Sequence, residues 1–177
     1  MKRILLTLSL ILGVHAVSAE NAFQASLTPE VAVVPRGDTV RGLALNIWGE
    51  NRVNGVNLGF VNGMVGDSSG FTYSLLGTYA EDYRGVIWGG FFTYTKGDIR
   101  GWQAAAINVS NGSLVGLQSG LANIGNQVKG VQLGFVNYTQ DLHGLQIGLI
   151  NIAASNPWFT DFPDKLATAF PIVNWSF

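Results

Sequence analysis

The sequence has 177 residues, contains no cysteine and carries a formal net charge of −1 at pH 7. The lack of cysteine excludes a disulfide framework, a cysteine-ligated metal and a catalytic thiol. Because the charge is slightly negative, the composition provides no electrostatic basis for binding nucleic acid, and we expect no nucleic-acid partner.

The first nineteen residues have the pattern of a secretory signal peptide. Lys2 and Arg3 form a short positive region, an apolar run follows over residues 4–14, and Ala-Val-Ser-Ala at residues 16–19 offers a small-residue cleavage site. The apolar run is too short to span a bilayer as a helix. We therefore predict an exported protein that is cleaved after Ala19, with a single β domain over residues 20–177.

A repeat of 13 to 16 residues covers about residues 42–153. Each of eight units opens with a glycine, at Gly42, Gly55, Gly70, Gly85, Gly101, Gly116, Gly130 and Gly144. The last four units carry Gln two residues after this glycine, and five units carry Asn seven residues after it. Self-similarity at a fixed period is the primary signal of the fold. The repeat amides are Asn62, Gln103, Asn108, Gln118, Asn123, Gln132, Asn137, Gln146 and Asn151.

Each unit contains eight to ten strand-like residues followed by a short charged turn. Within a strand, side chains alternate between two faces. In the seventh unit one face presents Val131, Leu133 and Phe135, and the other presents small residues and Gln132. Recurring glycines, β-branched residues and aromatics oppose helix, so we predict an all-β chain.

The chain ends with a predicted strand over residues 166–177, and its alternate residues from 169 to 177 are apolar. Trp175 and the terminal Phe177 resemble the assembly signal of bacterial outer-membrane β-barrel proteins. Pro171 departs from this pattern because proline cannot donate to a strand ladder.

Two architectures fit these observations. The main prediction is a small antiparallel transmembrane β-barrel of about ten strands, made of the eight repeats, residues 23–34 and the closing strand. The alternative is a β-solenoid with one repeat per coil, in which Gln and Asn form ladders and Val131, Leu133 and Phe135 fill a dry core. The recurrence of one motif in consecutive units favours the solenoid, and the variable period and the terminal Phe177 favour the barrel.

The units GVQLGFVN, GLQIGLIN and GVNLGFVN, with the closing FPIVNWSF, resemble bacterial surface repeat-containing proteins built from G-[VL]-Q-[LI]-G-[LF]-[VI]-N repeats. The resemblance implies an exported, envelope-associated protein and no catalytic activity. The units that open at Gly70 and Gly85 lack the amides and depart from the pattern.

Catalytic patterns are weak. His143 stands alone in a predicted turn, and Asp161 with Asp164 offers too few oxygen ligands for calcium. We therefore expect no enzyme, no cofactor and no metal. The expected function is a structural role in the outer membrane or at the cell surface, with outer-membrane lipid and the barrel assembly machinery as partners. The alternative is an exported solenoid that binds an unknown protein partner at the surface.

Overall fold

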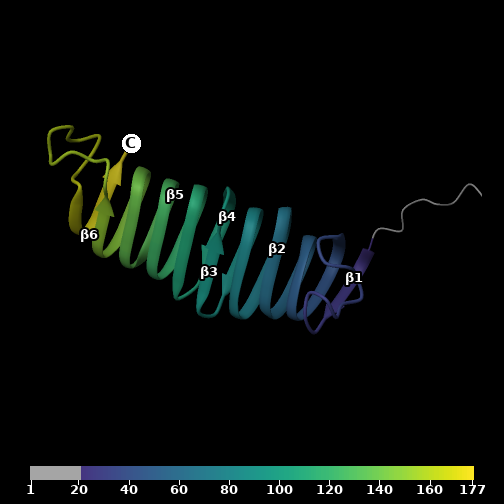
Figure 1. The fold of residues 1–177 in the computed structure, drawn as a ribbon. Helices are drawn as coiled ribbons and strands as arrows, with labels where there is room; N and C mark the ends of the chain where they lie inside the picture. Colours follow the sequence, from purple (N-terminus) through teal and green to yellow (C-terminus); the bar gives the residue numbers. More distant parts are fainter. Residues whose placement is uncertain (1–20) are drawn as a thin grey trace, which may run out of the picture.

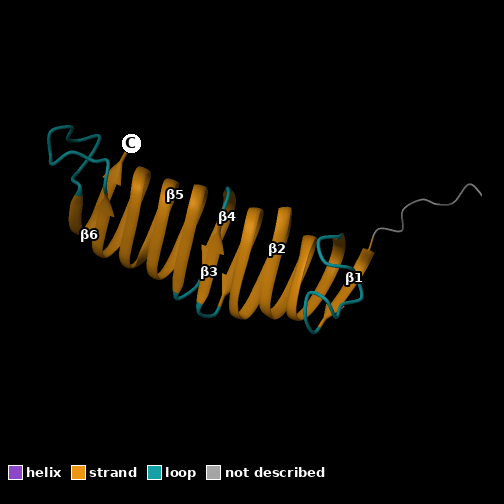
Figure 2. Ribbon diagram, viewed as in Figure 1, coloured by secondary structure: helices purple, strands orange, loops and turns teal. Residues whose placement is uncertain are grey.

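The chain is a stack of coils. The computed structural model describes residues 21–177, which wind through about seven turns of a β-solenoid (Figure 1). The predicted signal segment, residues 1–19, lies outside the described residues. Extended chain dominates the fold, and loops gather near its two ends and at the middle coils (Figure 2). The strands are β1 (Asn21–Ser26), β2 (Thr39–Gly89), β3 (Phe92–Thr95), β4 (Ile99–Ala104), β5 (Ile107–Ala153) and β6 (Ala169–Ser176).

Neighbouring coils pair in parallel, one repeat apart. β4 pairs with both β2 and β5 in parallel, and this register aligns Gly85 with Gly101 and Gly101 with Gly116. Strands joined by hairpins would instead be antiparallel, and the same repeat position would alternate between two ends of the sheet. The prediction of a ten-stranded antiparallel barrel is therefore wrong, and the solenoid alternative is correct. The expected role of the barrel assembly machinery loses its basis with the barrel.

The opening glycines form a column in which backbones come very close. Gly130 has φ +141°, and a Cβ atom on it would lie 2.0 Å from the carbonyl oxygen of Gly116 one coil below. Only glycine supplies both this backbone conformation and this close approach. The glycine recurs because each coil passes the same corner.

The interior of the solenoid is mainly polar. Among the described residues, 25 buried side chains are polar and 17 are hydrophobic. The expectation that Leu133 and Phe135 fill the core is wrong, since they are 37% and 56% exposed, while Gln132 is fully buried. Val131 is only half-buried. The faces are reversed because amides in a narrow stack of coils can bond to one another from coil to coil.

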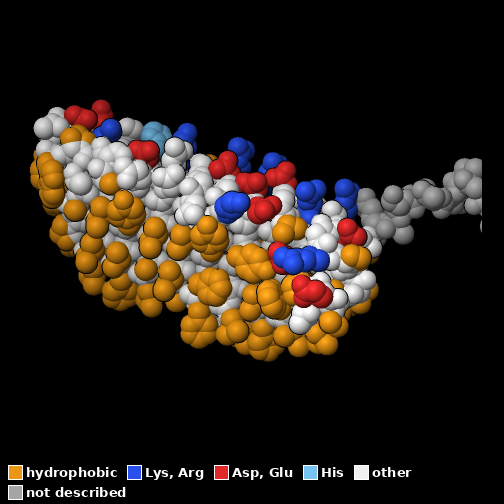
Figure 3. Space-filling model, in the orientation of Figure 1, with side chains coloured by type: hydrophobic (Ala, Val, Ile, Leu, Met, Phe, Trp, Pro, Cys, Tyr) orange, Lys and Arg blue, Asp and Glu red, His pale blue; other side chains and the backbone are white. Residues whose placement is uncertain are grey.

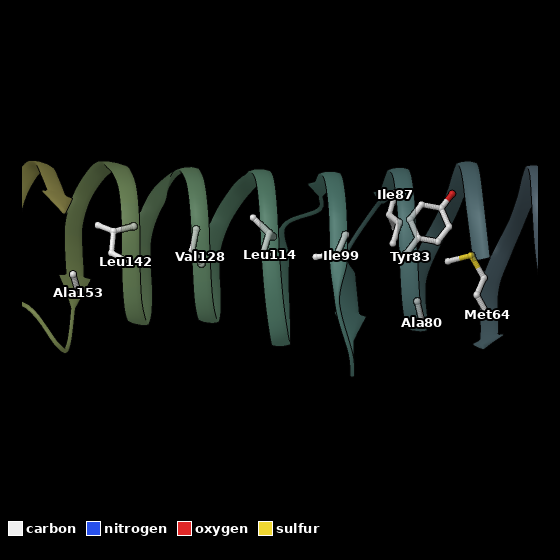
Figure 4. Packing of buried hydrophobic residues seen from close by; sticks show 9 residues of the cluster. All are labelled: Met64, Ala80, Tyr83, Ile87, Ile99, Leu114, Val128, Leu142 and Ala153. Carbon is white, nitrogen blue, oxygen red and sulfur yellow. The ribbon is translucent and has the colours of Figure 1, made fainter. Parts of the chain in front are cut away.

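One apolar column complements these amides. Ile99, Leu114, Val128 and Leu142 follow one another in successive coils (Figure 4). Each is at most 7% exposed. The column continues into earlier coils through Tyr83. Side chains at equivalent positions of successive coils contact one another. These contacts give each coil a small hydrophobic contribution to stability.

Both ends of the stack are covered. At the first coil, the segment 27–34 folds over β1, where Val33 N donates to Ala25 O at 3.0 Å. At the last coil, β6 pairs antiparallel with β5, and the preceding loop bonds to its outer edge, with Leu166 N donating to Trp175 O at 3.2 Å. Covered ends prevent edge-to-edge growth of the sheet.

Candidate functional site

The repeat glutamines form a buried ladder. Gln118 Nε2 donates to Gln103 Oε1 at 3.0 Å, Gln132 Nε2 to Gln118 Oε1 at 2.7 Å, and Gln146 Nε2 to Gln132 Oε1 at 2.7 Å. Each of these three side chains also donates to a backbone carbonyl on the opposite wall of its coil. The glutamines therefore hold each coil closed and bond it to its neighbour.

The repeat asparagines form a second ladder that runs in the opposite direction. Asn108 Nδ2 donates to Asn123 Oδ1 at 2.9 Å, Asn123 Nδ2 to Asn137 Oδ1 at 2.8 Å, and Asn137 Nδ2 to Asn151 Oδ1 at 2.8 Å. The glutamines donate toward the N-terminal coils, and the asparagines donate toward the C-terminal coils. Asn151 Nδ2 ends the column on the carbonyl of Phe170 in β6 at 3.2 Å.

The earlier coils combine amides with hydroxyl groups. Asn62, one of the predicted repeat residues, accepts from Asn46 Nδ2 at 3.0 Å and donates to Ser74 Oγ at 2.9 Å. Thr93 Oγ1 donates to Asn108 Oδ1 at 2.6 Å. Sequence reasoning missed Ser74 and Thr93, although their place in the alternating pattern could have identified them. The remaining predicted position, Gly55, belongs to the glycine column.

These interior residues cannot contact a ligand, because the amides of both ladders have no exposed surface. They are also neutral and do not titrate in water near pH 7. Among residues 21–177, no group of three or more histidine, aspartate or glutamate side chains is placed to hold a metal ion. The residues that could contact a ligand or partner therefore lie on the outer surface of the solenoid.

The outer surface is strongly apolar around one bend of each coil. Hydrophobic side chains cover the lower part of the face shown in Figure 3, along the stack. Phe135 with Val136, and Leu149 with Ile150, are consecutive outward residues and mark the bend, and Leu133 and its equivalents lie before it. We call these residues the apolar surface: Leu45, Ile47, Phe60, Leu75, Leu76, Phe91, Phe92, Ile107, Leu121, Leu133, Phe135, Val136, Ile147, Leu149 and Ile150.

The apolar surface is hollowed near the C-terminal end of the stack. A hollow of about 450 Å³ lies over Gly120, Gly134 and Gly148, and its apolar lining includes Leu121, Phe135, Ile147 and Leu149. Ile172 of β6 lines the same hollow, with φ +69° and a side chain that is 71% exposed.

Charged residues occupy the opposite edge of the coils, along the upper edge of the stack in Figure 3. In two successive turns an outward acid, a buried residue and an outward arginine follow one another, as in Asp98, Ile99 and Arg100. Other turns carry one charged residue next to their buried residue. We call all of these charged residues the charged edge: Arg41, Arg52, Asp67, Asp82, Arg84, Asp98, Arg100, Lys129 and Asp141.

Aromatic side chains with polar atoms lie between the two regions. Tyr94 accepts from Asn111 Nδ2 at 2.9 Å, and Tyr138 donates to Gln140 Oε1 at 3.4 Å. Tyr94 lies four residues before Asp98, and Tyr138 lies three residues before Asp141. On the other side, Trp102 follows the charged edge by two residues. The apolar surface is thus flanked by amphipathic rings.

The terminal aromatic residues are part of the C-terminal cover. Trp175 is half-buried, lies opposite Leu145 in β5 and donates from Nε1 to Pro163 O at 2.8 Å. Phe177 is 69% exposed, and its backbone N donates to Asp164 O at 2.9 Å. Their predicted role as an assembly signal depended on the barrel, so the structure leaves them a role in capping.

Tyr83 is the one interior tyrosine among the described residues. Burial raises its pKa to about 12 from an ordinary value of 10, and the hydrogen bond with the Thr72 hydroxyl, at 3.1 Å, opposes this rise. The unfolded chain therefore loses this proton at lower pH than the folded chain.

We expect the Tyr83 contribution to stability to be fully present below about pH 10 and to be lost as the pH rises toward 12, a difference of roughly 3 kcal/mol at full ionisation. Urea unfolding of the wild type and of Tyr83→Phe at several alkaline pH values measures it. Because burial also raises the pKa of Tyr79, the readout is the difference between the two proteins. Equal pH dependence in both would contradict the assignment.

Comparisons of the chain with protein-family models, with curated proteins and with solved structures find no match. In the part of the chain that the structure describes, no helix has the length and hydrophobicity needed to cross a membrane.

Proposed function

We propose that this chain is an exported, non-enzymatic protein of the bacterial outer membrane or cell surface, which binds a lipid bilayer through its apolar surface. The observation that carries the proposal is the reversal of the usual distribution of side chains: amides fill the interior, and Leu, Ile, Val and Phe point outward on coil after coil. Soluble monomers rarely expose continuous apolar patches larger than a few hundred Å². A surface of this kind requires a cover.

A bilayer fits this surface because the apolar residues lie on both sides of the bend. Leu133 and Ile147 precede the bend, whereas Val136 and Ile150 follow it. A single flat protein partner would cover one of these sides. Hydrocarbon covers both at once when the bend points into the membrane. The hollow over Gly134 adds a place where an acyl chain can lie.

The distribution of polar groups supports the same orientation. Tyr94, Tyr138 and Trp102 lie between the apolar surface and the charged edge, which is where amphipathic rings are enriched at membrane interfaces. Coil-to-coil pairing satisfies the backbone, which is a condition for placing strands in a non-aqueous environment. The charged edge lies outside the hydrocarbon.

Flotation of the mature protein with phosphatidylcholine vesicles tests the proposal. We expect the wild type to float and Phe135→Ser/Leu149→Ser to bind about thirtyfold more weakly, since two largely exposed side chains lose about 1 kcal/mol of transfer energy each. The matched control is Val115→Ser/Phe162→Ser, which removes two exposed apolar side chains outside the apolar surface. It should float like the wild type.

A wild-type protein that stays with the soluble fraction would contradict membrane binding. Light scattering on the same sample then distinguishes the remaining occupants of the apolar surface. A soluble dimer would indicate a second copy of the chain, and a soluble monomer would indicate a different protein partner, as in the binding-module alternative.

A further inference from the structure

At two neighbouring coils the charged edge separates its two signs. In the turns Asp82-Tyr83-Arg84 and Asp98-Ile99-Arg100, the acid precedes the buried residue and the arginine follows it. Because the coils stack in register, Asp98 follows Asp82 and Arg100 follows Arg84, and the next coil places Val115 opposite Arg100. Arg84 and Arg100 are direct register partners on neighbouring coils. At these two coils one row is therefore acidic and the other is basic, and Lys129 takes the basic position again on the coil after Val115.

The acids are engaged by the backbone. Asp82 Oδ1 accepts from Asp98 N at 2.7 Å, and Asp98 Oδ1 accepts from Ser113 N at 2.9 Å. Each carboxylate thus joins its own turn to the turn of the next coil, and it satisfies an amide that the sheet leaves open there. The acidic row has a structural role that accounts for its residues.

Arg84 and Arg100 have no such role. Arg84 and Arg100 are exposed, and within residues 21–177 neither has a carboxylate within ion-pair distance, whereas Arg36 bonds Glu50 at 2.8 Å. Like charges opposite each other on neighbouring strands repel. An anion bound between the two guanidinium groups would relieve this repulsion and accept several hydrogen bonds.

The basic row also borders the apolar side of the solenoid. Two residues after these arginines, the register partners Val86 and Trp102 lie within the strands that lead toward the bend. If the bend points into a bilayer, the arginines lie at the level of the lipid headgroups. Long cationic side chains reach such a level while their stems remain on apolar surface.

We infer that Arg84, Arg100 and the exposed Lys129 further along the row bind the phosphates of anionic lipid headgroups and give the solenoid a preference for anionic bilayers. This inference rests on the proposed membrane binding and adds the class of lipid to it. Charge complementarity at the edge of an apolar surface is its basis.

The test compares binding to vesicles of phosphatidylcholine alone and of phosphatidylcholine mixed with phosphatidylglycerol. We expect the wild type to bind the anionic vesicles more tightly. Arg84→Gln/Arg100→Gln should lose about thirtyfold of this preference, from the usual gain per basic residue near an anionic surface. Its binding to neutral vesicles should stay unchanged. Circular dichroism verifies that the variant is folded.

The matched control is Arg52→Gln/Lys96→Gln, which removes the same amount of charge. Arg52 and Lys96 are exposed and precede the buried residue of their turns, whereas Arg84 and Arg100 follow it. It should keep most of the preference. An equal loss in the two double variants, or a wild type that binds both kinds of vesicle equally, would overturn the inference and leave the proposed membrane binding intact. Failure of the wild type to bind either kind would overturn the proposed function itself.

Discussion

Asn137→Leu is expected to unfold the solenoid, although leucine is the more hydrophobic residue. Asn137 Nδ2 donates to Ile147 O at 2.9 Å and to Asn151 Oδ1 at 2.8 Å, and its Oδ1 accepts from Asn123 Nδ2 at 2.8 Å. Leucine would leave these partners buried without hydrogen bonds, at about 1–3 kcal/mol for each unsatisfied group. The three groups together give a loss of roughly 3–9 kcal/mol, which is comparable to the whole stability of many domains.

The control is Phe135→Ser, two residues away on the outer surface. Because Phe135 is 56% exposed, we expect its replacement to change stability in water by less than about 0.5 kcal/mol. Urea unfolding followed by circular dichroism measures both variants. The polar interior would be disproved by a wild-type midpoint for Asn137→Leu together with a large loss for Phe135→Ser.

Gly130→Ala is expected to prevent folding of the stack. The added methyl group would lie 2.0 Å from Gly116 O, so the two coils would have to separate where their backbones pair. The parallel hydrogen bonds on either side would lengthen or break, and the change would spread along the column. We expect insoluble protein, or soluble protein without a cooperative unfolding transition.

Gly37→Ala separates this steric effect from backbone strain. Gly37 also has a positive φ, +83°, but nothing lies within 4 Å of a Cβ atom placed on it. Its replacement should cost only roughly 1–2 kcal/mol of conformational strain and leave the protein folded. Similar behaviour of the two alanine variants, measured by soluble yield and thermal unfolding, would show that close coil packing is not the cause.

Much of the fold follows from the repeat. The period, the all-β character and the glycine column are visible in the sequence, because identical residues at a fixed spacing must occupy equivalent environments. The choice between barrel and solenoid was more difficult. A terminal Phe177 and strands of membrane-spanning length favoured the barrel. However, Gly116, Gly130 and Gly144 open successive units at the same spacing, and this regularity suits only strands that return in the same direction.

The orientation of the faces could not be predicted from alternation alone. A period of two shows that Gln132 and Leu133 point to opposite sides, but not which side is inside. The usual rule assigns Leu133 to the core, and this rule was wrong here. One clue was present: Phe135 and Val136 are consecutive apolar residues, and an outward bend explains both better than a straight strand does.

The irregular coils were the least predictable part of the interior. Thr72 and Ser74 replace the amides with hydroxyl groups, and Tyr83 fills space that the smaller side chains leave open. Hydroxyls bond in several directions, so no fixed motif marks them. The apolar surface and the charged edge were both assembled from residues whose individual patterns were visible, but their placement on opposite edges required the coil geometry.

The opposed directions of the two amide columns have a consequence for how such a chain can change its size. A single row of aligned amides would accumulate a dipole moment with every added coil, as a helix does along its axis. Here each further repeat adds one glutamine that donates toward the N-terminal coils and one asparagine that donates toward the C-terminal coils, and the two moments oppose each other. Duplication or deletion of a whole repeat therefore leaves the electrostatic state of both caps nearly unchanged, so the length of the stack can vary by whole coils between related proteins.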